Sequence, residues 1–569
     1  MKIPFIGGSY QGRSSNVASQ SMVNYFYEKN VDGESIVSTP GCTTKVTPKV
    51  GEVRGGIEYN DLAYFVIGNT FYEINSAGTA TSRGTLNTSS GRVSMAHNGF
   101  RVGAKQQIMI VDGSDAWTYD NTTSTLSLSS STTIAEVQAS ISAVTTGAST
   151  TTFTTSGVHG LSTGWTVRIE DIVDDGPDGD METMFNDNSY VITVTDTTNF
   201  TVAVNSSALT NAWSSAGTAT REAVDINTTS VVFIDGYFLL AQTDTDRFWL
   251  TGLYDGTTID PLDFATAEGD PDKIQALIAD QRELFLFGER TLEVWYNSGD
   301  SDNTFQRFQG GFKQTGCVAQ HSPARVDNNI YWLSRDERGH GQVVKMGEGY
   351  SPQVISTPAI AYQFSTYSTI SDAFAYAYQH EGHEFYVLTF PTASKTWVYD
   401  ASTQQWHERG HTIDDAFPNR ERYNCHVFAF GKHLFGDYTN GNIYQLDSTV
   451  GTISGTSIPR ERITSTVNDE EKRIRISALQ LDMEEGIGDP NVSTDTKMWM
   501  SWSKDGGHAY SDEIDRSAGD SGDYERRVIW RRLGHARNWT FRLRTWTPNP
   551  HVLKGLYARL YGESREGGR

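Results

Sequence analysis

Short runs of large apolar residues, separated by polar turns, recur along most of the chain. The clearest copy spans residues 277–296, LIADQRELFLFGERTLEVWY, in which three apolar runs are divided by turns after Asp280 and at Glu289 and Arg290. Short runs that are rich in β-branched and aromatic residues and bounded by turn residues are typical of strands. This stretch therefore predicts a small antiparallel meander.

Six further stretches repeat this pattern, and they begin near Asn60, Asn98, Asp235, Asp327, Glu381 and Gly431. With one long interruption before Asp235 set aside, the copies follow one another at roughly 40 to 50 residues, which is the period of propeller blades. Each predicted sheet has large apolar residues on both faces and buries them only by stacking against its neighbours. We predict an all-β chain built on a β-propeller of six or seven blades. The alternative is a β-sandwich with several hairpins.

The remaining chain divides around these repeats. We predict that residues 1–50 form an N-terminal segment that enters the propeller, that residues 51–133 form the first blades, and that residues 222–457 form the remaining blades. Residues 134–221 follow a Ser/Thr-rich stretch and contain short alternating runs, which predicts an inserted small β-barrel or sandwich module. Residues 458–569 contain longer alternating runs and are predicted to form a C-terminal β-rich block.

The negative charge of the chain is unevenly distributed. The formal net charge is −23, and the first 457 residues hold 27 of the 46 Lys and Arg residues but 51 of the 69 Asp and Glu residues. Such an acidic body disfavours tight, sequence-reading nucleic-acid binding, which depends on basic residues that neutralise phosphates.

The cysteines and the apolar segments exclude several classes of protein. Cys42, Cys317 and Cys425 lack metal-ligand spacing, and we expect them to be buried, reduced thiols. No apolar segment is long enough to span a membrane, and the N-terminus lacks the charged start and apolar core of a secretory signal. We therefore expect the chain to start in a cytoplasm.

One turn motif stands out in the C-terminal block. Ser503, Asp505, Gly507 and Tyr510 fit the Asp-box pattern Ser-x-Asp-x-Gly-x-x-aromatic. In that pattern the carboxylate and the hydroxyl bond to the turn backbone, while the aromatic ring anchors the hairpin. We predict a structural Asp-box turn without a catalytic role.

Other acidic and histidine-containing stretches give no specific chemistry. His380 and His383 have the spacing His-x-x-His on a predicted hairpin turn, which favours a solvated turn over a zinc site. The acidic run from Asp174 to Asp180 lacks the terminal Glu of a dedicated calcium loop, so a flexible acidic loop is favoured over calcium. No carboxylate pair can be singled out for glycoside hydrolysis. We predict no enzyme activity, no metal and no cofactor.

An arginine run lies in the C-terminal block. Arg526, Arg527, Arg531 and Arg532 surround Val528-Ile529-Trp530, so a strand here would carry charge on both faces. The acidic remainder of the chain makes these arginines candidates for a subunit interface, with a solvated surface as the alternative.

Both ends of the chain resemble one family. The matching residues are Gly8-Ser9-Tyr10, Gln20, Val23-Asn24-Tyr25, Glu28 and Thr39-Pro40-Gly41 near the start, and residues 502–505, residues 526–532 and Leu533-Gly534 near the end. The pattern resembles tail proteins of short-tailed bacteriophages, the tail nozzle or packaged-DNA stabilisation proteins. That family usually has an aliphatic residue where this chain has Cys42.

The resemblance implies a structural virion protein. It implies a homo-oligomeric ring, a hexamer, around the DNA exit channel of the tail, which retains packaged double-stranded DNA and guides its ejection. Adjacent tail proteins, namely an adaptor, a fibre or spike and a needle, would be its partners, with residues 1–50 making tail contact and assembly taking place in the host cytoplasm. Acidic walls would let DNA slide without sticking. The alternative is a phage protein that binds or cleaves glycans with a sialidase-like propeller.

Overall fold

Strands account for nearly all of the regular structure. The computed structural model describes residues 1–14, 19–31, 33–103, 105–129, 133–134, 137–161, 163, 166–177, 179–221, 224–225, 227–267, 269–300, 304–413, 416–470, 472–484, 496–520 and 522–560. In these residues the longest helix is α2 (Pro358–Ser365), where the Ile360 amide donates a 3.3 Å hydrogen bond to Oγ1 of Thr357. No helix of the described part is both long and apolar enough to cross a membrane. The all-β prediction is confirmed.

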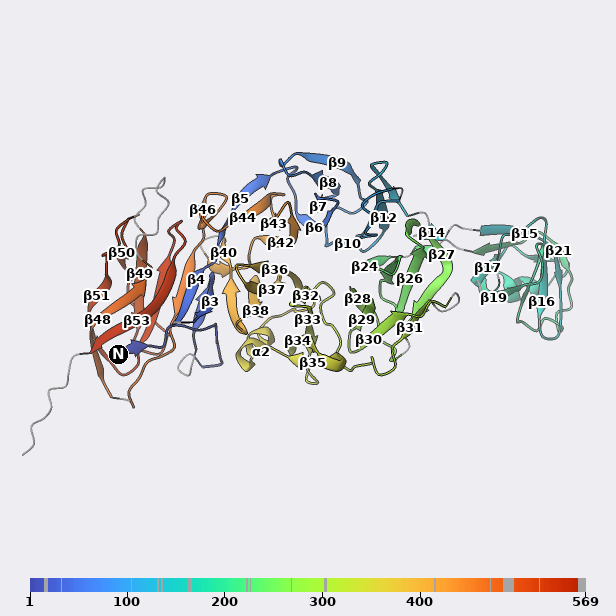
Figure 1. Ribbon diagram of the computed structural model, residues 1–569. Helices are drawn as coiled ribbons and strands as arrows, with labels where there is room; N and C mark the ends of the chain where they lie inside the picture. Colours follow the sequence, from blue (N-terminus) through green and yellow to red (C-terminus); the bar gives the residue numbers. More distant parts are fainter. Residues whose placement is uncertain are drawn as a thin grey trace, which may run out of the picture. The chain divides into compact units, whose positions relative to one another are not determined.

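Seven sheets of the described residues, each with four antiparallel blade strands, follow the repeats of the sequence (Figure 1). Blade 1 is β6 (Val53–Tyr59), β7 (Leu62–Ile67), β8 (Thr70–Ile74) and β9 (Ala80–Thr85); blade 2 is β10 (Ser94–His97), β11 (Gln107–Val111), β12 (Ala116–Asp120) and β13 (Thr125–Leu128); blade 3 is β24 (Thr228–Ile234), β25 (Tyr237–Gln242), β26 (Arg247–Gly252) and β27 (Asp255–Thr266); blade 4 is β28 (Ile274–Asp280), β29 (Glu283–Gly288), β30 (Leu292–Asn297) and β31 (Phe305–Arg307). Blade 5 is β32 (Ala324–Val326), β33 (Asn329–Arg335), β34 (Gly341–Gly347) and β35 (Ser351–Val354); blade 6 is β36 (Phe374–His380), β37 (His383–Phe390), β38 (Lys395–Asp400) and β39 (Gln405–Arg409); blade 7 is β42 (Tyr423–Ala429), β43 (Lys432–Asp437), β44 (Ile443–Asp447) and β5 (Gly41–Val46). The propeller thus has seven blades.

The first hairpin of most blades uses the same two-residue turn. In blade 4, Gln281 and Arg282 join β28 to β29 with φ angles of +47° and +66°. Two consecutive positive φ angles define the turn whose twist matches that of antiparallel strands. The same left-handed pairs occur at Asn60-Asp61, Asp235-Gly236, Asp327-Asn328, Glu381-Gly382 and Phe430-Gly431. Most of these turns are the polar breaks that mark the repeats in the sequence.

Neighbouring blades are joined by buried aromatic residues. Between blades 1 and 2, Tyr64 and Phe71 pack against Tyr119. Between blades 4 and 5, the rings of Phe287 and Trp332 lie 5.3 Å apart between their centroids. Fully burying such a side chain stabilises the fold by about 1.5–3 kcal/mol, so each sheet depends on its neighbours.

The start of the chain closes the propeller. β5 pairs antiparallel with β44, with Cys42 opposite Leu446, so the last blade takes its outer strand from the N-terminal segment (Figure 1). Two short strands, β45 (Thr452–Ile453) and β46 (Thr456–Ser457), extend the same sheet. The first and last parts of the repeat are therefore held together by backbone hydrogen bonds.

The C-terminal block forms a β-sandwich that the N-terminal segment completes. One sheet contains β1 (Lys2–Ile3), β3 (Tyr25–Asn30), β4 (Gly33–Ser38), β53 (Val552–Leu560), β48 (Ile474–Met483) and β51 (Val528–Ala536). The other contains β2 (Ser21–Val23), β47 (Arg460–Ile463), β52 (Thr540–Thr545), β49 (Lys497–Ser503) and β50 (Ile514–Ser517). Their shared core includes Tyr25 and Ile36 from the start of the chain and Trp530, Trp539 and Phe541 from its end.

The sandwich and the propeller share a sheet. β2 lies between β39 of blade 6 and β47 of the sandwich, because Val23 pairs with Glu408 on one side and Glu461 on the other. We predicted that the N-terminal segment enters the propeller. It also contributes strands to both sheets of the sandwich. The side chains of Tyr25, Tyr27 and Ile36 anchor these strands, because Tyr25 and Ile36 lie in the sandwich core and Tyr27 packs against it.

A separate unit of the chain comprises residues 128–227 and 257–263. It contains a closed barrel of β15 (Val137–Thr145), β16 (Thr151–Thr155), β20 (Asn199–Val202), β19 (Asn188–Val194), β17 (Thr166–Glu170) and β22 (Thr218–Arg221), together with α1 (Asp180–Phe185), β18 (Val173–Asp174), β21 (Trp213–Ser215), β14 (Thr133–Ile134) and β23 (Val224–Asp225). Phe153 packs against Phe185 and Phe200 in its core. The barrel alternative of the sequence-based prediction is the one observed.

Closure of the propeller is sensitive to the side chain at position 41. A Cβ atom added to Gly41 would collide with the backbone of Val450 and Thr452. We predict that Gly41→Val weakens the pairing of β5 and lowers the free energy of unfolding by about 1–3 kcal/mol, the usual effect of overpacking. Urea denaturation followed by tryptophan fluorescence measures this. Gly33→Ala is the control, because a Cβ at Gly33 meets no atom within 4 Å; equal midpoints for both variants would contradict the prediction.

Candidate functional site

One end of the propeller axis is crossed by side chains. The first strands of the blades neighbour one another, as β10 and β24 or β36 and β42 do, so these strands form the inner wall. Before the first strand of blade 2, Arg92 donates hydrogen bonds of 3.1 and 2.6 Å to Oδ1 and O of Asn424 in blade 7, and its guanidinium carbon lies 3.8 Å from the ring centroid of Phe374 in blade 6. Gln320, before blade 5, donates a 3.1 Å bond to the carbonyl oxygen of Thr229 in blade 3.

These bonds connect blades that are not neighbours in the ring. Side chains can reach past an adjacent blade only close to the axis, where the inner strands converge. The Arg92 bond joins blade 2 to blade 7 across blade 1, and the Gln320 bond joins blade 5 to blade 3 across blade 4. The centre of the propeller is therefore bridged by protein at the end where the first strands begin, and it is not an open passage for a large ligand.

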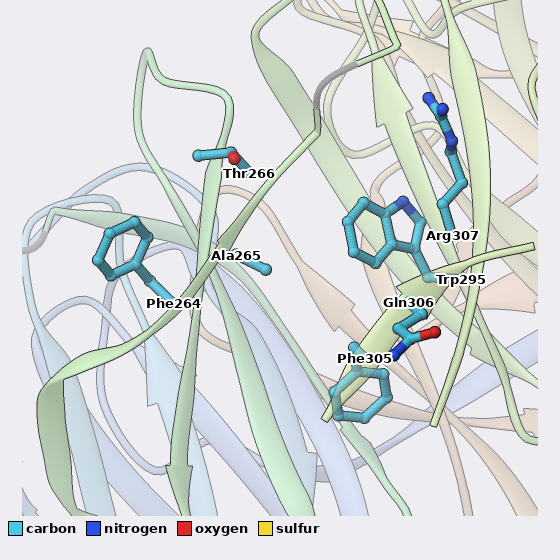
Figure 2. A pocket seen from close by; sticks show the side chains of 7 residues that line it. All are labelled: Phe264, Ala265, Thr266, Trp295, Phe305, Gln306 and Arg307. Carbon is cyan, nitrogen blue, oxygen red and sulfur yellow. The ribbon is translucent and has the colours of Figure 1, made fainter. Parts of the chain in front are cut away.

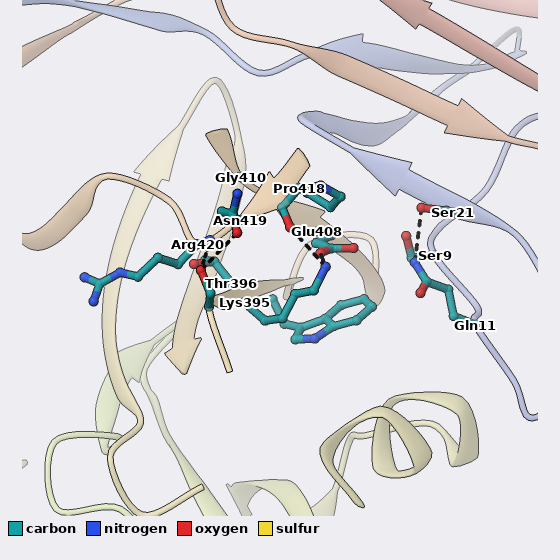
Figure 3. Close-up of polar contacts among 12 residues, drawn as sticks. Ser9, Gln11, Ser21, Lys395, Thr396, Glu408, Gly410, Pro418, Asn419 and Arg420 are labelled. Atoms are coloured by element: carbon teal, nitrogen blue, oxygen red, sulfur yellow. Dashed lines mark hydrogen bonds and ion pairs between the residues drawn. The ribbon is translucent and has the colours of Figure 1, made fainter. Parts of the chain in front are cut away.

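A polar cavity of about 490 Å³ lies where the N-terminal segment, blade 6 and the sandwich meet. Its lining includes Gln11, Gln20, Gln363, Lys395, Glu408, Glu461, His508 and Tyr510. Figure 3 shows its blade 6 side, where Nζ of Lys395 lies 2.6 Å from Oε1 of Glu408 and donates to the Pro418 carbonyl oxygen at 3.3 Å. On the sandwich side, Nε of Arg544 lies 2.6 Å from Oε2 of Glu461.

The two carboxylates that line this cavity are both in ion pairs. Glu408 and Glu461 are buried, with 2% and 5% exposure, and each is paired with a cation. Burial raises the pKa of Glu408, while the Lys395 ammonium lowers it. A glycosidase needs one carboxylate free to give a proton and another free to attack or to activate water. These paired carboxylates instead neutralise cations at a joint between two parts of the fold.

The predicted Asp-box residues lie on the turn that borders this cavity. Oγ of Ser503 accepts a 2.8 Å hydrogen bond from the Gly507 amide, and Oδ1 of Asp505 accepts bonds of 3.0 Å from the amides of His508 and Ala509. The pKa of Asp505 is lowered by the hydrogen bonds that its carboxylate accepts, first from the Ala509 amide and next from the Ser503 hydroxyl. The Tyr510 ring lies under the Arg542 guanidinium, 4.3 Å from its carbon. The side chains of Ser503 and Asp505 hold the turn, and the Tyr510 ring packs against Arg542 of the neighbouring strand.

A second hollow, of about 550 Å³, lies between the outer strands of blades 3 and 4. Figure 2 shows Phe264, Ala265 and Thr266 on one wall and Trp295, Phe305, Gln306 and Arg307 on the other. Arg307 pairs with the buried Glu293 at 3.4 Å. No group of catalytic character faces another among the residues that line this hollow.

The arginine run is exposed. Arg526 and Arg527 precede β51, and Arg526 lies 3.8 Å from Asp523. The pairing of β48 with β51 shifts register between Ile476 and Ala478, and Arg532 has a φ of +64°. This bulge leaves Arg531 and Arg532 both exposed, whereas Val528 and Trp530 are buried. We predicted that these charges would occupy both faces of the strand. They do not, because one face, with Val528 and Trp530, packs in the sandwich core.

The remaining sequence candidates have local structural contacts. His380 and His383 flank the turn of β36 and β37, and Nδ1 of His383 lies 2.7 Å from Oδ2 of Asp400. Asp174 accepts hydrogen bonds from the amides of Gly176 and Met181; Asp178 lies outside the described residues. The described part of the chain contains no group of three or more His, Cys, Asp or Glu residues suited to a metal ion. Cys42, Cys317 and Cys425 are buried free thiols.

Two buried arginines escaped the sequence analysis. Arg462, fully buried, donates 2.8 and 2.5 Å bonds to the Phe5 carbonyl oxygen and a 3.1 Å bond to that of Ser21. Arg460 donates to the carbonyl oxygens of Thr39 and Thr547, each at 3.2 Å. Burial lowers the pKa of Arg462 to about 9. In a strand, alternating arginines indicate a solvated face, so no local signal reveals that these two hold the N-terminal segment.

Removal of the Arg462 donors tests that role. We expect Arg462→Met to keep the volume of the side chain but to destabilise the protein by about 1–3 kcal/mol for each carbonyl left without a donor. Urea denaturation measures the loss, and hydrogen exchange of β2 locates it. Arg338→Met, at an exposed turn, should stay within about 0.5 kcal/mol of the wild type. An Arg462→Met variant as stable as this control would rule out the role.

His551 predicts that the contact between β3 and the C-terminal strands of the sandwich is sensitive to acid. Its Nδ1 lies 3.1 Å from the Asn549 carbonyl oxygen, and its Nε2 lies 2.8 Å from the Tyr25 hydroxyl. Burial lowers the pKa of His551 to about 3. The folded state thus keeps His551 neutral where the unfolded state binds a proton, so its contribution to stability is present above about pH 6.5 and falls by about 1.4 kcal/mol per pH unit below it.

Paired urea titrations at pH 7.5 and 5.5 measure this effect. We expect His551→Gln to lose less stability on acidification than the wild type does. His508→Gln, at an exposed histidine of the same sandwich, is the control and should behave like the wild type. Identical losses in all three proteins would show that His551 makes no contribution.

Comparisons with known proteins agree with this architecture. A family model described as Bacteriophage P22 Gp10, beta-propeller, matches residues 1–146 and 128–451, and another described as Bacteriophage P22 Gp10, beta-sandwich, matches residues 459–561. No curated protein matches the chain. The N-terminal domain of Nup159 is similar with a TM-score of 0.34 and 7% identity over 78% of this chain and 98% of that one. The Pan2 WD40 domain of Neurospora crassa gives 0.29 and 8% over 70% and 89%.

These structural similarities are weak, whereas the two family models together cover nearly the whole chain. They match the two folds that the strand pairing builds, first the propeller and then the sandwich. The chain therefore belongs to the Bacteriophage P22 Gp10 family, the tail nozzle or DNA stabilisation proteins of short-tailed phages, and is a structural protein of the virion tail.

Proposed function

We propose that the chain assembles as a homo-oligomeric ring of six copies around the DNA exit channel of the tail, where it retains packaged DNA and guides its ejection. The observation that carries this proposal is the family match, which extends through both the propeller and the sandwich. The ring would form in the host cytoplasm and join an adaptor, a fibre or spike and a needle, with the N-terminal segment near those contacts.

The bridged propeller axis supports a channel between copies. Duplex DNA is wide, and the bonds of Arg92 and Gln320 cross the centre of the propeller. A passage for DNA must therefore be enclosed by several chains, as closed rotational symmetry provides. The acidic excess of the first 457 residues favours sliding, because a negative wall repels the phosphate backbone and prevents tight adhesion.

The contacts between copies would be partly electrostatic. Arg526 and Arg527 are exposed ahead of β51, which is the last strand of its sheet. An edge strand is a natural place for a neighbouring chain to approach, and a neighbouring acidic propeller would complement these two arginines. We assign them to the subunit boundary of the ring.

Assembly mass tests this proposal. Native mass spectrometry and electron microscopy of the purified protein, alone and with its neighbouring tail components, should reveal closed rings of six 63.0-kDa chains. We expect Arg526→Glu with Arg527→Glu to shift the population towards single chains, because like charges then face each other. The control is Arg338→Glu with Lys432→Glu, which makes the same charge change at exposed propeller turns. A chain that joins no ring under any of these conditions would refute the proposal.

A further inference from the structure

Four strands of one sandwich sheet, β1, β53, β48 and β51, expose a cluster of cations. On β1, β53, β48 and β51 and at the bulge of β51, six cationic residues are exposed: Lys2, Arg475, Arg531, Arg532, Lys554 and Arg559. Only two carboxylates, those of Asp482 and Glu484, lie on the same strands or directly after them and are not fully buried. This concentration contrasts with the chain as a whole, whose net charge is −23.

The strand register aligns these charges in rows. Ala478 of β48 pairs with Arg531 of β51 on one side and with Arg559 of β53 on the other. Paired residues of antiparallel strands point to the same face, so the two arginines flank the small Ala478, which is 8% exposed and lies outside the sandwich core. In the next row, Tyr557 pairs with Gln480 and with Lys2.

The spacing of the rows suits a polyanion. Neighbouring strands lie about 4.8 Å apart, so Arg531 and Arg559, two strands from each other, are separated by roughly 10 Å between their backbones. Among the described residues, no carboxylate lies within ion-pair distance of Arg531, Arg532 or Arg559. Their charges are therefore compensated by solvent ions, which a row of phosphates can replace with a gain in entropy.

The composition of the face favours a nucleic acid over a protein. The centre of a protein interface is depleted of charged residues and enriched in packed apolar ones. Here Arg531, on the edge strand β51, and Arg559, on β53, flank Ala478, and Tyr557, 40% exposed, is the one large ring in the described rows. Duplex DNA presents about one phosphate per 1.7 Å of its axis, so it can engage several cations of a flat sheet at once.

We propose that this basic sheet face, centred on Arg531 and Arg559, binds the phosphate backbone of duplex DNA without reading its sequence. Its role in the virion rests on the proposed ring around the exit channel, where the face would grip the DNA that the acidic propeller lets slide. The binding itself is a property of the purified chain and is measured independently of the ring.

Fluorescence anisotropy of a labelled duplex of about 30 base pairs, between about 50 and 200 mM salt, tests the proposal. We expect wild-type affinity to fall steeply with salt. In Arg531→Gln with Arg559→Gln, affinity at low salt should fall by about tenfold or more, and the slope of log affinity against log salt should decrease by about 2, one for each phosphate contact. The matched control, Arg338→Gln with Lys432→Gln, removes two exposed cations from the propeller and should bind as the wild type does.

The same samples separate the alternatives. Unfolding midpoints equal to that of the wild type show that the exposed substitutions leave the fold intact. A double variant with unchanged affinity and slope overturns the proposal, as does a wild-type chain that fails to bind at low salt. If the double variant loses its assembly mass while keeping DNA affinity, the face is a contact between copies and the DNA proposal is wrong. If no ring forms but the salt-dependent loss is observed, the ring fails and the binding face stands.

Discussion

The N-terminal segment is the constraint on which both large parts of the structure depend. Within its first 46 residues, the chain supplies strands to both sandwich sheets and then β5, the outer strand of blade 7. Neither the sandwich nor the propeller can be complete until this segment is in place. Because β2 also joins blade 6 to the sandwich through Val23, the two folds form one continuous sheet at this point. They are therefore expected to unfold together.

The way this segment is held explains why so many polar groups are buried at the joint. A segment that passes between two sheets leaves carbonyl groups that pair with no neighbouring strand, and each needs a donor. Arg460 and Arg462 serve the carbonyls of Thr39, Phe5 and Ser21. A guanidinium has five N–H donors in a planar fork, so one side chain can satisfy several acceptors. Those bonds offset part of the desolvation of the two cations, and burial still lowers the pKa of both Arg460 and Arg462.

The sequence revealed the repeated part of the fold better than its junctions. The blades are visible because their hairpins combine short apolar runs with two-residue turns such as Gln281-Arg282, and both features are local. The Asp-box turn is readable for the same reason. The contribution of Tyr25 and Ile36 to a core that closes with Trp530 is not local, since the partners are some 500 residues apart. Likewise, no pattern distinguishes the buried Arg462 from the exposed Arg531; only the register of the sheets does so.

Under the proposed function, the distribution of charge would give the propeller and the sandwich different tasks. A protein that encloses DNA must avoid holding it everywhere, because electrostatic contacts to phosphate add up along the duplex. An acidic propeller with a bridged axis gives neither a binding groove nor a passage through its own centre. A group of exposed cations instead lies on one sheet of the sandwich, where Arg531 and Arg559 are held by strand pairing on either side of Ala478. In the proposed ring, retention and sliding would both occur, because attraction would be confined to this sheet face while the larger acidic surface repels the same polymer.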